Sequence, residues 1–344
     1  MDKQDLRDLS YEELESFVMN ELEEKRFRAR QIFDWIYIKN AVSFEEMSNL
    51  SRELREKLDE HATIAPIRLT DLRRSQDGTE KLQFTLDDGS LIESVVIPSE
   101  DRLTLCMSSQ VGCAMGCAFC YTASLKLKRN LRTAEIVDQY RQALRHIGGD
   151  KERITNIVLM GMGEPLHNLE AVAKACNLLM DERGFNLSSR KVTVSTCGLV
   201  PEIARLADLT NVSLAVSLNA TVDDVRSRIM PINRRYGLQE LMDALDRFPK
   251  PRRKRIVLEY VLLRGVNDTP DDARRLARMA RRIGCKVNLI PFNPHDASEF
   301  EAPEMDRVLS FQAILFEGDV SAFIRDSRGL DIHGACGMLG KRRP

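Results

Sequence analysis

The chain has 344 residues, 43% of them hydrophobic and 30% charged, with a formal net charge of −1. This composition is ordinary for a globular protein, and the charge gives no global argument for nucleic-acid binding. No apolar run approaches the roughly 18 residues that cross a bilayer, and the start MDKQDLRDLSYEELESF is too polar for a secretory signal. We therefore expect a cytoplasmic protein that binds no membrane, built as one large domain with attachments or as two domains.

Residues 1–62 show the 3.6-residue period of amphipathic helices. Ser10 and Glu13 have the spacing of a capping box, and Ser43 with Glu46 repeats it, which predicts the cap of a further helix. The segment contains no metal-binding or catalytic cluster. We therefore expect a helical accessory domain that serves in docking, most simply to RNA.

Residues 63–100 change to a period of two. The stretch KLQFTLDDGSLIESVVIP alternates around Asp88-Gly89, which predicts a β-hairpin that extends or links the main domain. Glu93 lies among apolar neighbours in the second strand of this hairpin. A carboxylate at such a position is more often at an edge or facing solvent than catalytic.

From residue 101 to 317, short apolar strands alternate with amphipathic helices. Six such units in series predict a parallel sheet, either an open doubly wound sheet or a partial barrel, with ligands at the carboxyl ends of the strands. The tail, 318–344, contains one more candidate strand, VSAFIRDS, and a glycine-rich loop with Cys336. The predicted strands are 103–109, 154–161, 191–196, 212–218, 255–263 and 286–292, and predicted helices include 133–147, 169–183, 238–247 and 270–283.

Three cysteines, Cys113, Cys117 and Cys120, stand in a C-x3-C-x2-C spacing after the first of these strands. Clustered thiolates in a reducing compartment bind a soft metal or an iron–sulfur cluster. A structural zinc site takes four ligands, and Cys106 is the one nearby residue that would complete such a set. Without Cys106, the three cysteines fit a 4Fe–4S cluster whose fourth iron binds a substrate or cofactor.

The cysteine motif at this place in a (βα)6 chain resembles the radical S-adenosylmethionine (SAM) superfamily, in which the open iron binds the amino and carboxylate groups of SAM. GMGEP at 161–165 follows the second strand and resembles the glycine-rich SAM motif of that superfamily. Its Gly161 and Gly163 would let the backbone approach a ligand closely, and Glu164 would accept hydrogen bonds from an ammonium group.

Nearly the whole chain resembles the RlmN/Cfr group of radical SAM RNA adenine methyltransferases, and the RlmN branch most closely. The resemblance implies a partial (βα)6 TIM-like barrel with an amino-terminal helical accessory domain and a β-hairpin extension. The matching stretches are LCMSSQVGCAMGCAFCYTA, NIVLMGMGEPLHN, VTVSTCGLVP, LAVSLNA, RSRIMPINRRY, EYVLLRGVND, NLIPFNP and ACGML.

The resemblance also implies roles for single residues. It implies that Cys336 is methylated during turnover, that Cys106 is its partner cysteine, and that Glu93 is a candidate proton acceptor in the active site. Asn219 stands where many members have histidine. The implied cluster ligands are Cys113, Cys117 and Cys120, and the implied SAM contacts are Gly163, Glu164, Ser195, Ser217, Leu218, Asn219 and Asn293.

The implied reaction methylates C2 of an adenine in 23S ribosomal RNA and in transfer RNA next to the anticodon. This carbon is electrophilic, so the electrophilic methyl group of SAM cannot reach it by polar transfer. In the implied scheme Cys336 first accepts a methyl group from one SAM. A radical from a second SAM then converts that group to a methylene radical, which adds to the adenine. Cys106 removes the proton and attacks the sulfur of Cys336, which leaves a disulfide that cellular thiols reduce.

The implied partners are RNA and an electron donor such as flavodoxin or ferredoxin. The enzyme is expected to be a monomer. Two alternatives stay open at this point. One is a Cfr-type enzyme that methylates C8 of the same adenine. The other is a non-catalytic RNA-binding protein with a structural four-cysteine metal site that includes Cys106. The basic runs at 126–132 and 249–255 are candidate RNA contacts, although such runs are more often solvated faces.

Overall fold

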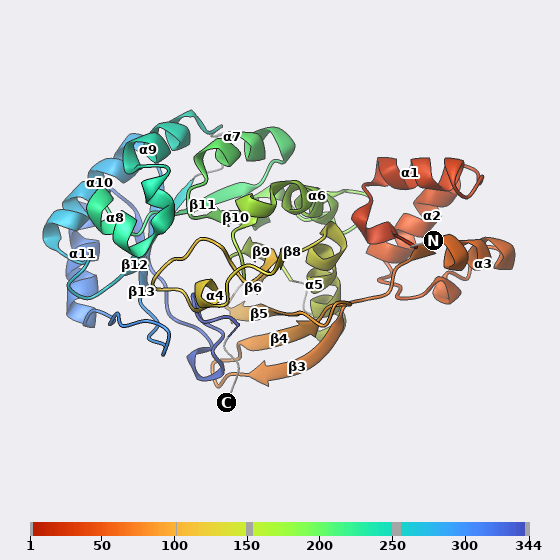
Figure 1. Ribbon diagram of the computed structural model, residues 1–344, viewed down its shortest axis with the longest axis horizontal. Helices are drawn as coiled ribbons and strands as arrows, with labels where there is room; N and C mark the ends of the chain where they lie inside the picture. The colour runs from red at the N-terminus through yellow and green to blue at the C-terminus, as the bar shows by residue number, and fades with distance from the viewer. Residues whose placement is uncertain (1–2, 101, 149–153, 250–255, 341–344) are drawn as a thin grey trace.

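A computed structural model describes residues 3–100, 102–148, 154–249 and 256–340. Its centre is a ten-stranded sheet in the order β14-β13-β12-β11-β10-β9-β6-β5-β4-β3. Strands β6 and β9 to β14 pair in parallel, and the sheet curves without closing (Figure 1), which confirms the predicted partial barrel. The parallel strands are β6 (Arg102–Cys106), β9 (Asn156–Leu159), β10 (Val192–Thr196), β11 (Ser213–Ser217), β12 (Val257–Leu262), β13 (Lys286–Pro291) and β14 (Ala322–Ile324).

Helices follow the outer side of this curved sheet (Figure 1). Helix α10 shows why the sequence signals predict their bounds well. Thr269 and Asp272 form a capping box at its start, and Gly284 ends it with a φ of 70°. The outer helices are α5 (Thr133–His146), α6 (Leu169–Met180), α7 (Val200–Leu209), α8 (Asp223–Ile229), α9 (Leu238–Arg247), α10 (Pro270–Ile283) and α11 (Met305–Glu317).

The predicted hairpin is confirmed, but it is part of the main sheet. Gly89 at its turn has a φ of 74°, and the Asp88 side chain accepts a hydrogen bond from the backbone N–H of Ser90 at 2.9 Å. The second strand of the hairpin pairs antiparallel with β6, with Val95 opposite Cys106. A third, outer strand is largely exposed, so it lacked the apolar alternation that would have predicted it. This antiparallel extension consists of β3 (Arg68–Arg74), β4 (Glu80–Thr85) and β5 (Leu91–Ser99).

The amino-terminal module is helical, as predicted. The capping box is formed, with Ser10 N–H donating to Glu13 at 2.7 Å and Glu13 N–H donating to the Ser10 hydroxyl at 3.2 Å. The prediction of a further helix capped by Ser43 is wrong: Phe44–Glu46 is one 3-10 turn, and the Ser43 side chain makes no cap bond. The last helix is capped by Ser51 instead. The helices are α1 (Tyr11–Asn20), α2 (Phe27–Tyr37) and α3 (Arg52–His61).

A buried ionic cluster fixes this module to the core. Asp138 of α5 accepts a hydrogen bond from Arg141 at 2.7 Å and lies 3.1 Å from the Arg7 guanidinium. Arg141 also donates to the backbone oxygen of Ala41, and Asp5 pairs with Arg7 at 2.7 Å. The four side chains are buried, and their two positive and two negative charges balance. Because such charges are tolerated inside a protein only as mutual partners, the cluster specifies where the module docks.

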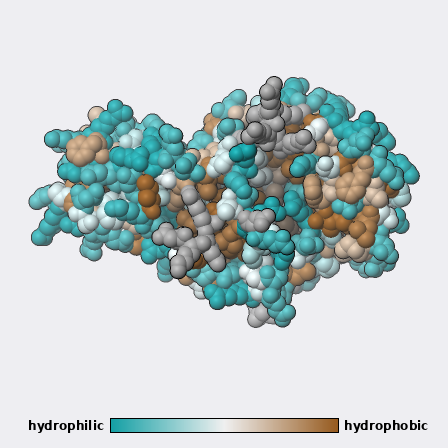
Figure 2. Space-filling model, turned by 180° about the vertical axis from the view of Figure 1, so that it is seen from behind, coloured by the Kyte–Doolittle hydropathy of each residue, from teal (hydrophilic) through white to brown (hydrophobic). Residues whose placement is uncertain are grey.

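The described surface is predominantly hydrophilic when seen from behind, and the amino-terminal module forms the smaller lobe at the left (Figure 2). Apolar side chains on α11 and β14 are an exception: Met305, Leu309, Phe316 and Phe323 are exposed. Within the described part of the chain, every helix is too short or too polar to cross a membrane.

Replacing Arg141 by alanine would leave Asp138 without one of its two cationic partners. We expect the Arg141→Ala variant to lose about 3 kcal/mol of unfolding free energy, because breaking a buried ion pair leaves an uncompensated charge. Urea denaturation measures this. Arg278→Ala on the exposed face of α10 is the control and should change the value by less than about 0.5 kcal/mol. Equal stability of the two variants would contradict the docking role.

Candidate active site

Two adjoining cavities lie within the partial barrel. The larger has a volume of about 420 Å³ and the smaller about 160 Å³. Both are lined by side chains from the parallel strands and the carboxyl-terminal tail, as expected for this kind of sheet. They share part of their wall, so a group on that wall faces both. The shared residues are Met160, Glu259, Ile290, Asn293 and Cys336.

The smaller cavity is lined by all three cysteines of the C-x3-C-x2-C motif. They lie on the loop between β7 (Gln110–Val111) and the short helix α4 (Tyr121–Ser124), and all are free thiols. Burial raises the pKa of Cys113 to about 12 and that of Cys117 well above its usual value. Thiols in such surroundings stay protonated unless a metal cation compensates the thiolate charge.

These residues fit an iron–sulfur cluster better than a single ion. Within the described residues, no group of three or more metal-ligating side chains converges on one ion. In an iron–sulfur cluster each of the three thiolates would bind a different iron, so they need not converge on one ion. The thiol sulfurs of Cys113 and Cys120 also accept hydrogen bonds from backbone N–H groups, which stabilise thiolate ligands. Cys106 does not line this cavity, so the structure gives no support to the four-cysteine site.

The glycines of GMGEP pack so closely against a neighbouring segment of the chain that a larger residue would clash with it. A Cβ atom on Gly161 would lie 2.6 Å from the backbone oxygen of Met107, and one on Gly163 would lie 2.5 Å from Gln110. Gly163 has a φ of 101°, which disfavours other residues. The close approach that these glycines permit within the chain is to residues 107–110. Both also line the smaller cavity, so their approach to a ligand stays a prediction.

Glu164 is held rigidly at the edge of the smaller cavity. Its backbone N–H donates to Gln110 at 2.8 Å, and its carboxylate accepts hydrogen bonds from the backbone N–H groups of Cys197 at 2.8 Å and Leu166 at 3.1 Å. Burial raises the pKa of this carboxyl group. A cationic ligand such as an ammonium group would compensate the buried negative charge.

Most of the other predicted SAM contacts also reach the smaller cavity. Leu218 is the exception: it is buried and does not line the cavity. Asn219 has a φ of 56°, and its side-chain oxygen already accepts the Val261 N–H at 2.8 Å. Asn293 donates to the backbone oxygen of Cys336 at 3.0 Å, so it also holds the tail. The lining residues from this set are Gly163, Glu164, Ser195, Ser217, Asn219 and Asn293.

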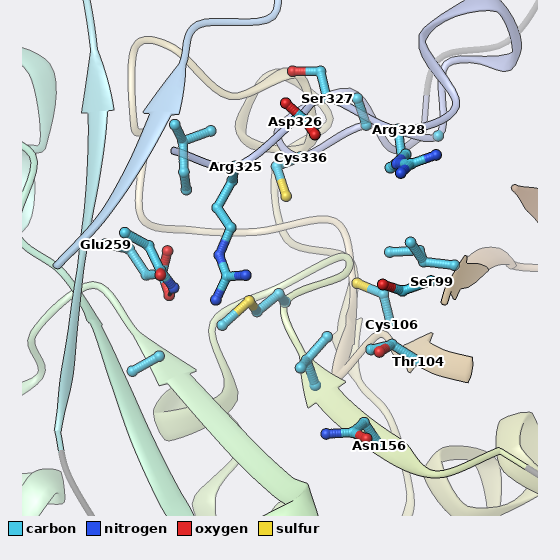
Figure 3. A pocket seen from close by; sticks show the side chains of 18 of the residues that line it. Ser99, Thr104, Cys106, Asn156, Glu259, Arg325, Asp326, Ser327, Arg328 and Cys336 are labelled. Atoms are coloured by element: carbon cyan, nitrogen blue, oxygen red, sulfur yellow. Dashed lines mark hydrogen bonds between the residues drawn. The ribbon is translucent and has the colours of Figure 1, made fainter. Parts of the chain in front are cut away.

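Cys106 and Cys336 meet at the larger cavity although 230 residues separate them. Figure 3 shows both sulfur atoms directed into it, Cys106 from the end of β6 and Cys336 from the tail. Burial raises the pKa of Cys336 to about 11, and the neighbouring Glu259 carboxylate adds to that shift. Both cysteines are free thiols here, so the implied disulfide stays a prediction.

Glu93 lies apart from both cavities. It is buried, so the expectation of an edge or solvent-facing residue is wrong. Its carboxylate lies 3.1 Å from the Lys81 ammonium group and accepts a hydrogen bond from the Gly340 N–H at 2.8 Å. The structure therefore places Glu93 against the carboxyl-terminal tail.

Sequence reasoning missed two buried residues at the site. Glu259 lines both cavities and accepts a hydrogen bond from Asn288 at 2.7 Å, and burial raises its pKa to about 7. Arg226 of α8 donates to the backbone oxygens of Leu218 and Cys197, which fixes two strand ends around the smaller cavity. A charged residue within an apolar strand was the available signal for Glu259. A single arginine in a helix gives no comparable signal.

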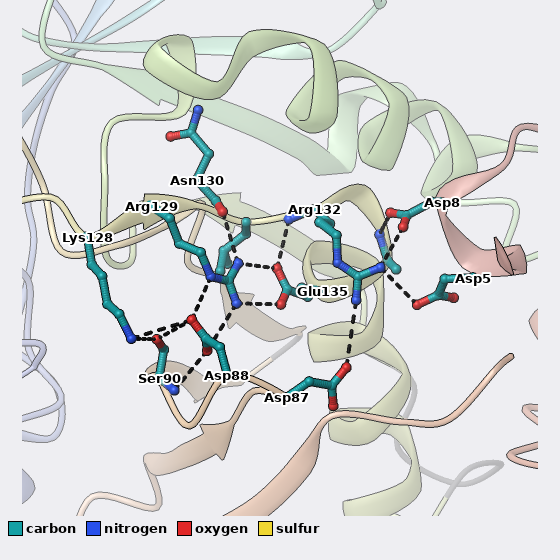
Figure 4. A network of polar contacts seen from close by, with 12 residues as sticks. Asp5, Asp8, Asp87, Asp88, Ser90, Lys128, Arg129, Asn130, Arg132 and Glu135 are labelled. Atoms are coloured by element: carbon teal, nitrogen blue, oxygen red, sulfur yellow. Dashed lines mark hydrogen bonds and ion pairs between the residues drawn. The ribbon is translucent and has the colours of Figure 1, made fainter. Parts of the chain in front are cut away.

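The basic run at 126–132 is largely occupied by internal partners (Figure 4). Arg129 pairs with Asp88 at 3.0 Å and with Glu135 at 2.8 Å, and Arg132 pairs with Asp8 at 2.7 Å. These contacts join the loop to the hairpin, to α5 and to the amino-terminal module. The run at 249–255 falls outside the described residues apart from Pro249.

Comparisons with known proteins agree with this geometry. Residues 4–64 match the model of the ribosomal RNA large subunit methyltransferase N-terminal domain, and residues 107–280 match the radical SAM superfamily. The chain is 52% identical to the dual-specificity RNA methyltransferase RlmN of Geotalea uraniireducens, over 99% of this chain and 98% of that protein. The RlmN protein of Geobacter sulfurreducens is 51% identical over 97% of this chain and 91% of that protein.

The chain belongs to the RlmN family. A solved radical SAM methyltransferase from Sphaerobacter thermophilus superposes with a TM-score of 0.93 at 43% identity, and the match covers 98% of this chain and 99% of that one. The predicted fold class and the activity of a SAM-dependent RNA methyltransferase are thereby confirmed. So are the predicted cofactors, a 4Fe–4S cluster and SAM, which membership of the radical SAM superfamily implies.

Removal of one cluster ligand should abolish iron binding without unfolding the barrel. We expect Cys117→Ala, purified without oxygen, to lack the iron and the visible absorption of the wild-type protein, because two thiolates cannot hold the cluster. The control is Cys176→Ala, which replaces a buried cysteine of α6 outside the cavity. Wild-type iron content in the Cys117 variant would show that these cysteines are not the ligands.

Proposed function

We propose that the chain methylates C2 of an adenine in 23S ribosomal RNA and in transfer RNA, through a methyl group carried on Cys336. The observation that carries this proposal is the position of Cys336 on the wall shared by the two cavities, with Cys106 on the larger one. One side faces the cysteine motif and Glu164, and the other side has room for a base. The RlmN relatives, named as dual-specificity RNA methyltransferases, support the same substrates.

The chain's own residues account for the difficult parts of this reaction. When bound, the cluster and SAM supply the methyl group and the 5′-deoxyadenosyl radical. Cys336 carries the carbon from the smaller cavity to the larger one, where it bonds to C2. Cys106 would accept the proton that leaves C2, while the adduct gives up one electron to the bound cluster. The Cys106 thiolate would then bond to the sulfur of Cys336 as the bond from that sulfur to the methyl carbon breaks. The released carbon takes up a proton to become the methyl group, and a Cys106–Cys336 disulfide remains for cellular thiols to reduce. Cys106 is buried, which keeps its thiol out of bulk water and protects it from side reactions, whereas Cys336 is exposed on the wall between the two cavities and can reach both.

The cluster ligands we propose are Cys113, Cys117 and Cys120. Glu164 is proposed to bind the SAM ammonium group, and Gly163, Ser195, Ser217 and Asn293 to line the SAM site. Asn219 and Leu218 are proposed to contribute through the backbone, because the side chain of one is already hydrogen-bonded and that of the other is buried in the core. A flavodoxin-like or ferredoxin-like donor, a monomeric state and a cytoplasmic location complete the proposal.

The test uses unmodified 23S ribosomal RNA fragments and transfer RNA with the loaded enzyme. Wild-type protein should yield 2-methyladenosine, detected by mass spectrometry after digestion. Cys336→Ala should yield no methylated adenosine, and Cys106→Ala should accumulate a covalent protein–RNA adduct visible on a denaturing gel. Cys176→Ala should behave as wild type.

Two outcomes would overturn the proposal. Formation of 8-methyladenosine would assign the chain to the Cfr-type reaction. Free methylated product from the Cys336 variant would remove that cysteine from the reaction.

RNA must reach the larger cavity with its base extruded or unpaired, because the cavity is a recess between the barrel strands and the tail. Arginines stand on the lining of this cavity, and Arg102, Arg325 and Arg328 are exposed. None of the three forms a salt bridge with another described residue, unlike the cations of the 126–132 run. We therefore propose that Arg102 and Arg328 contact phosphates beside the extruded nucleotide, with the amino-terminal module as a further docking surface.

Affinity for transfer RNA at several salt concentrations tests the phosphate contacts. Each of the Arg102→Ala and Arg328→Ala variants should bind more weakly and lower the slope of log K against log salt by about 1, since each removes one phosphate contact. Arg278→Ala on α10 is the control and should leave the slope unchanged. An unchanged slope for both the Arg102→Ala and the Arg328→Ala variants would show that RNA binds elsewhere.

A further inference from the structure

The tail that carries Cys336 has little regular structure of its own. We call residues 329–340 the Cys336 loop. Apart from one 3-10 turn, Leu330–Ile332, it has no helix or strand, and Gly329, Gly337 and Gly340 have positive φ angles. Glycine-rich segments have many accessible conformations, so their position depends on contacts with neighbouring elements. The question is which contacts fix this loop.

The antiparallel extension supplies contacts at both ends of the Cys336 loop. At the start, the Asp77 carboxylate accepts a hydrogen bond from the Gly329 N–H at 2.9 Å. At the end, the Glu93 carboxylate accepts one from the Gly340 N–H at 2.8 Å. Figure 1 shows the carboxyl-terminal segment, in dark blue, beside β3 and β4. Both ends of the Cys336 loop are therefore hydrogen-bonded to the same antiparallel extension.

Further contacts from the extension reach the loop between these ends. The Lys81 ammonium group donates to the backbone oxygen of His333 at 3.3 Å and lies 3.1 Å from Glu93. Asp331 accepts a hydrogen bond from the Ser75 hydroxyl at 2.6 Å. Lys81 is 2% exposed and the Glu93 side chain 7%. A lysine so deeply buried needs its carboxylate partner, and the pair then holds two separate points of the loop.

We propose that Lys81 and Glu93 form a positioning pair that holds the Cys336 loop so that the thiol reaches both cavities. The inference rests on the proposed function and assigns Glu93 a different role from that of a proton acceptor. Its two carboxylate oxygens are engaged, one by Lys81 and the other by Gly340, and it lines neither cavity. Lys81 acts through the loop and touches no reacting atom.

The experiment compares Lys81→Met with wild type in two independent measurements. The first is the fraction of Cys336 that becomes methylated when the loaded enzyme is given SAM without RNA, read by peptide mass spectrometry. The second is the rate at which iodoacetamide alkylates Cys336, which requires no cofactor. Iron content and release of 5′-deoxyadenosine with reductant show whether the cluster site is intact.

We expect Lys81→Met to keep its iron and its SAM cleavage. Its methylation rate at Cys336 should fall by as much as about 10²-fold, because a displacement of about 1 Å is enough for such a loss. Alkylation of Cys336 should become faster as the loop loosens. Lys81→Arg, which keeps the positive charge, should recover part of the methylation. A purely structural role would lower iron content and SAM cleavage together with methylation.

Asp77→Ala gives a second test at the exposed β3–β4 turn, in case Lys81→Met fails to fold. It removes the contact at Gly329 and should show the same pattern in weaker form. Asp87→Ala on the β4–β5 turn is the matched control, since Asp87 is 95% exposed and makes no contact with the loop. Wild-type methylation and alkylation in the Asp77 variant, with the same result or loss of iron in the Lys81 variant, would overturn the proposal.

The same measurements separate this inference from the proposed function. If wild-type Cys336 never acquired a methyl group, the proposed function would fail. Faster alkylation of Cys336 in the Lys81 and Asp77 variants, but not in the Asp87 control, would still support the positioning pair.

Discussion

The antiparallel pairing of β5 with β6 is the interaction on which the rest of the structure depends. It joins the three-stranded extension to the first strand of the parallel sheet and sets Val95 opposite Cys106. The extension then contacts two other parts of the chain. Asp88 at one end pairs with Arg129, next to the amino-terminal module, and Glu93 holds the Cys336 loop from inside the sheet. A slip of one residue in this register would turn Glu93 and its neighbours to the opposite face.

The two cavities share a wall that includes Cys336. The smaller one gathers partly buried thiols and a buried carboxylate, whose charged forms are costly in the absence of cationic partners. A cluster and a sulfonium cofactor would supply those positive charges. The larger cavity pairs Cys336 with Cys106, away from the cluster motif. Glu259 lines both cavities, and its negative charge raises the pKa of Cys336.

Many charged side chains of this protein form salt bridges that hold parts of the chain together, which the sequence alone does not indicate. Most cations of the 126–132 run bind carboxylates of the hairpin, α5 and the amino-terminal module. The buried cluster of Arg7, Asp138 and Arg141 joins the same parts from the inside. Arg102 and Arg328, on the lining of the larger cavity, form no salt bridge with another described residue. A basic run in a sequence shows charge, but only the fold shows whether that charge is already paired.

The sequence by itself determined the parallel strands, the capped helices, the hairpin and the cysteine motif, because these depend on residues close together in the chain. It could not determine the outer strand β3, whose residues are mostly exposed, or the burial of Glu93. Nor could it show that Lys81, Asp77 and Asp331 meet around one loop. Those contacts join residues about 250 positions apart, and only the tertiary structure decides such pairs, since nothing in local periodicity specifies which distant segments become neighbours.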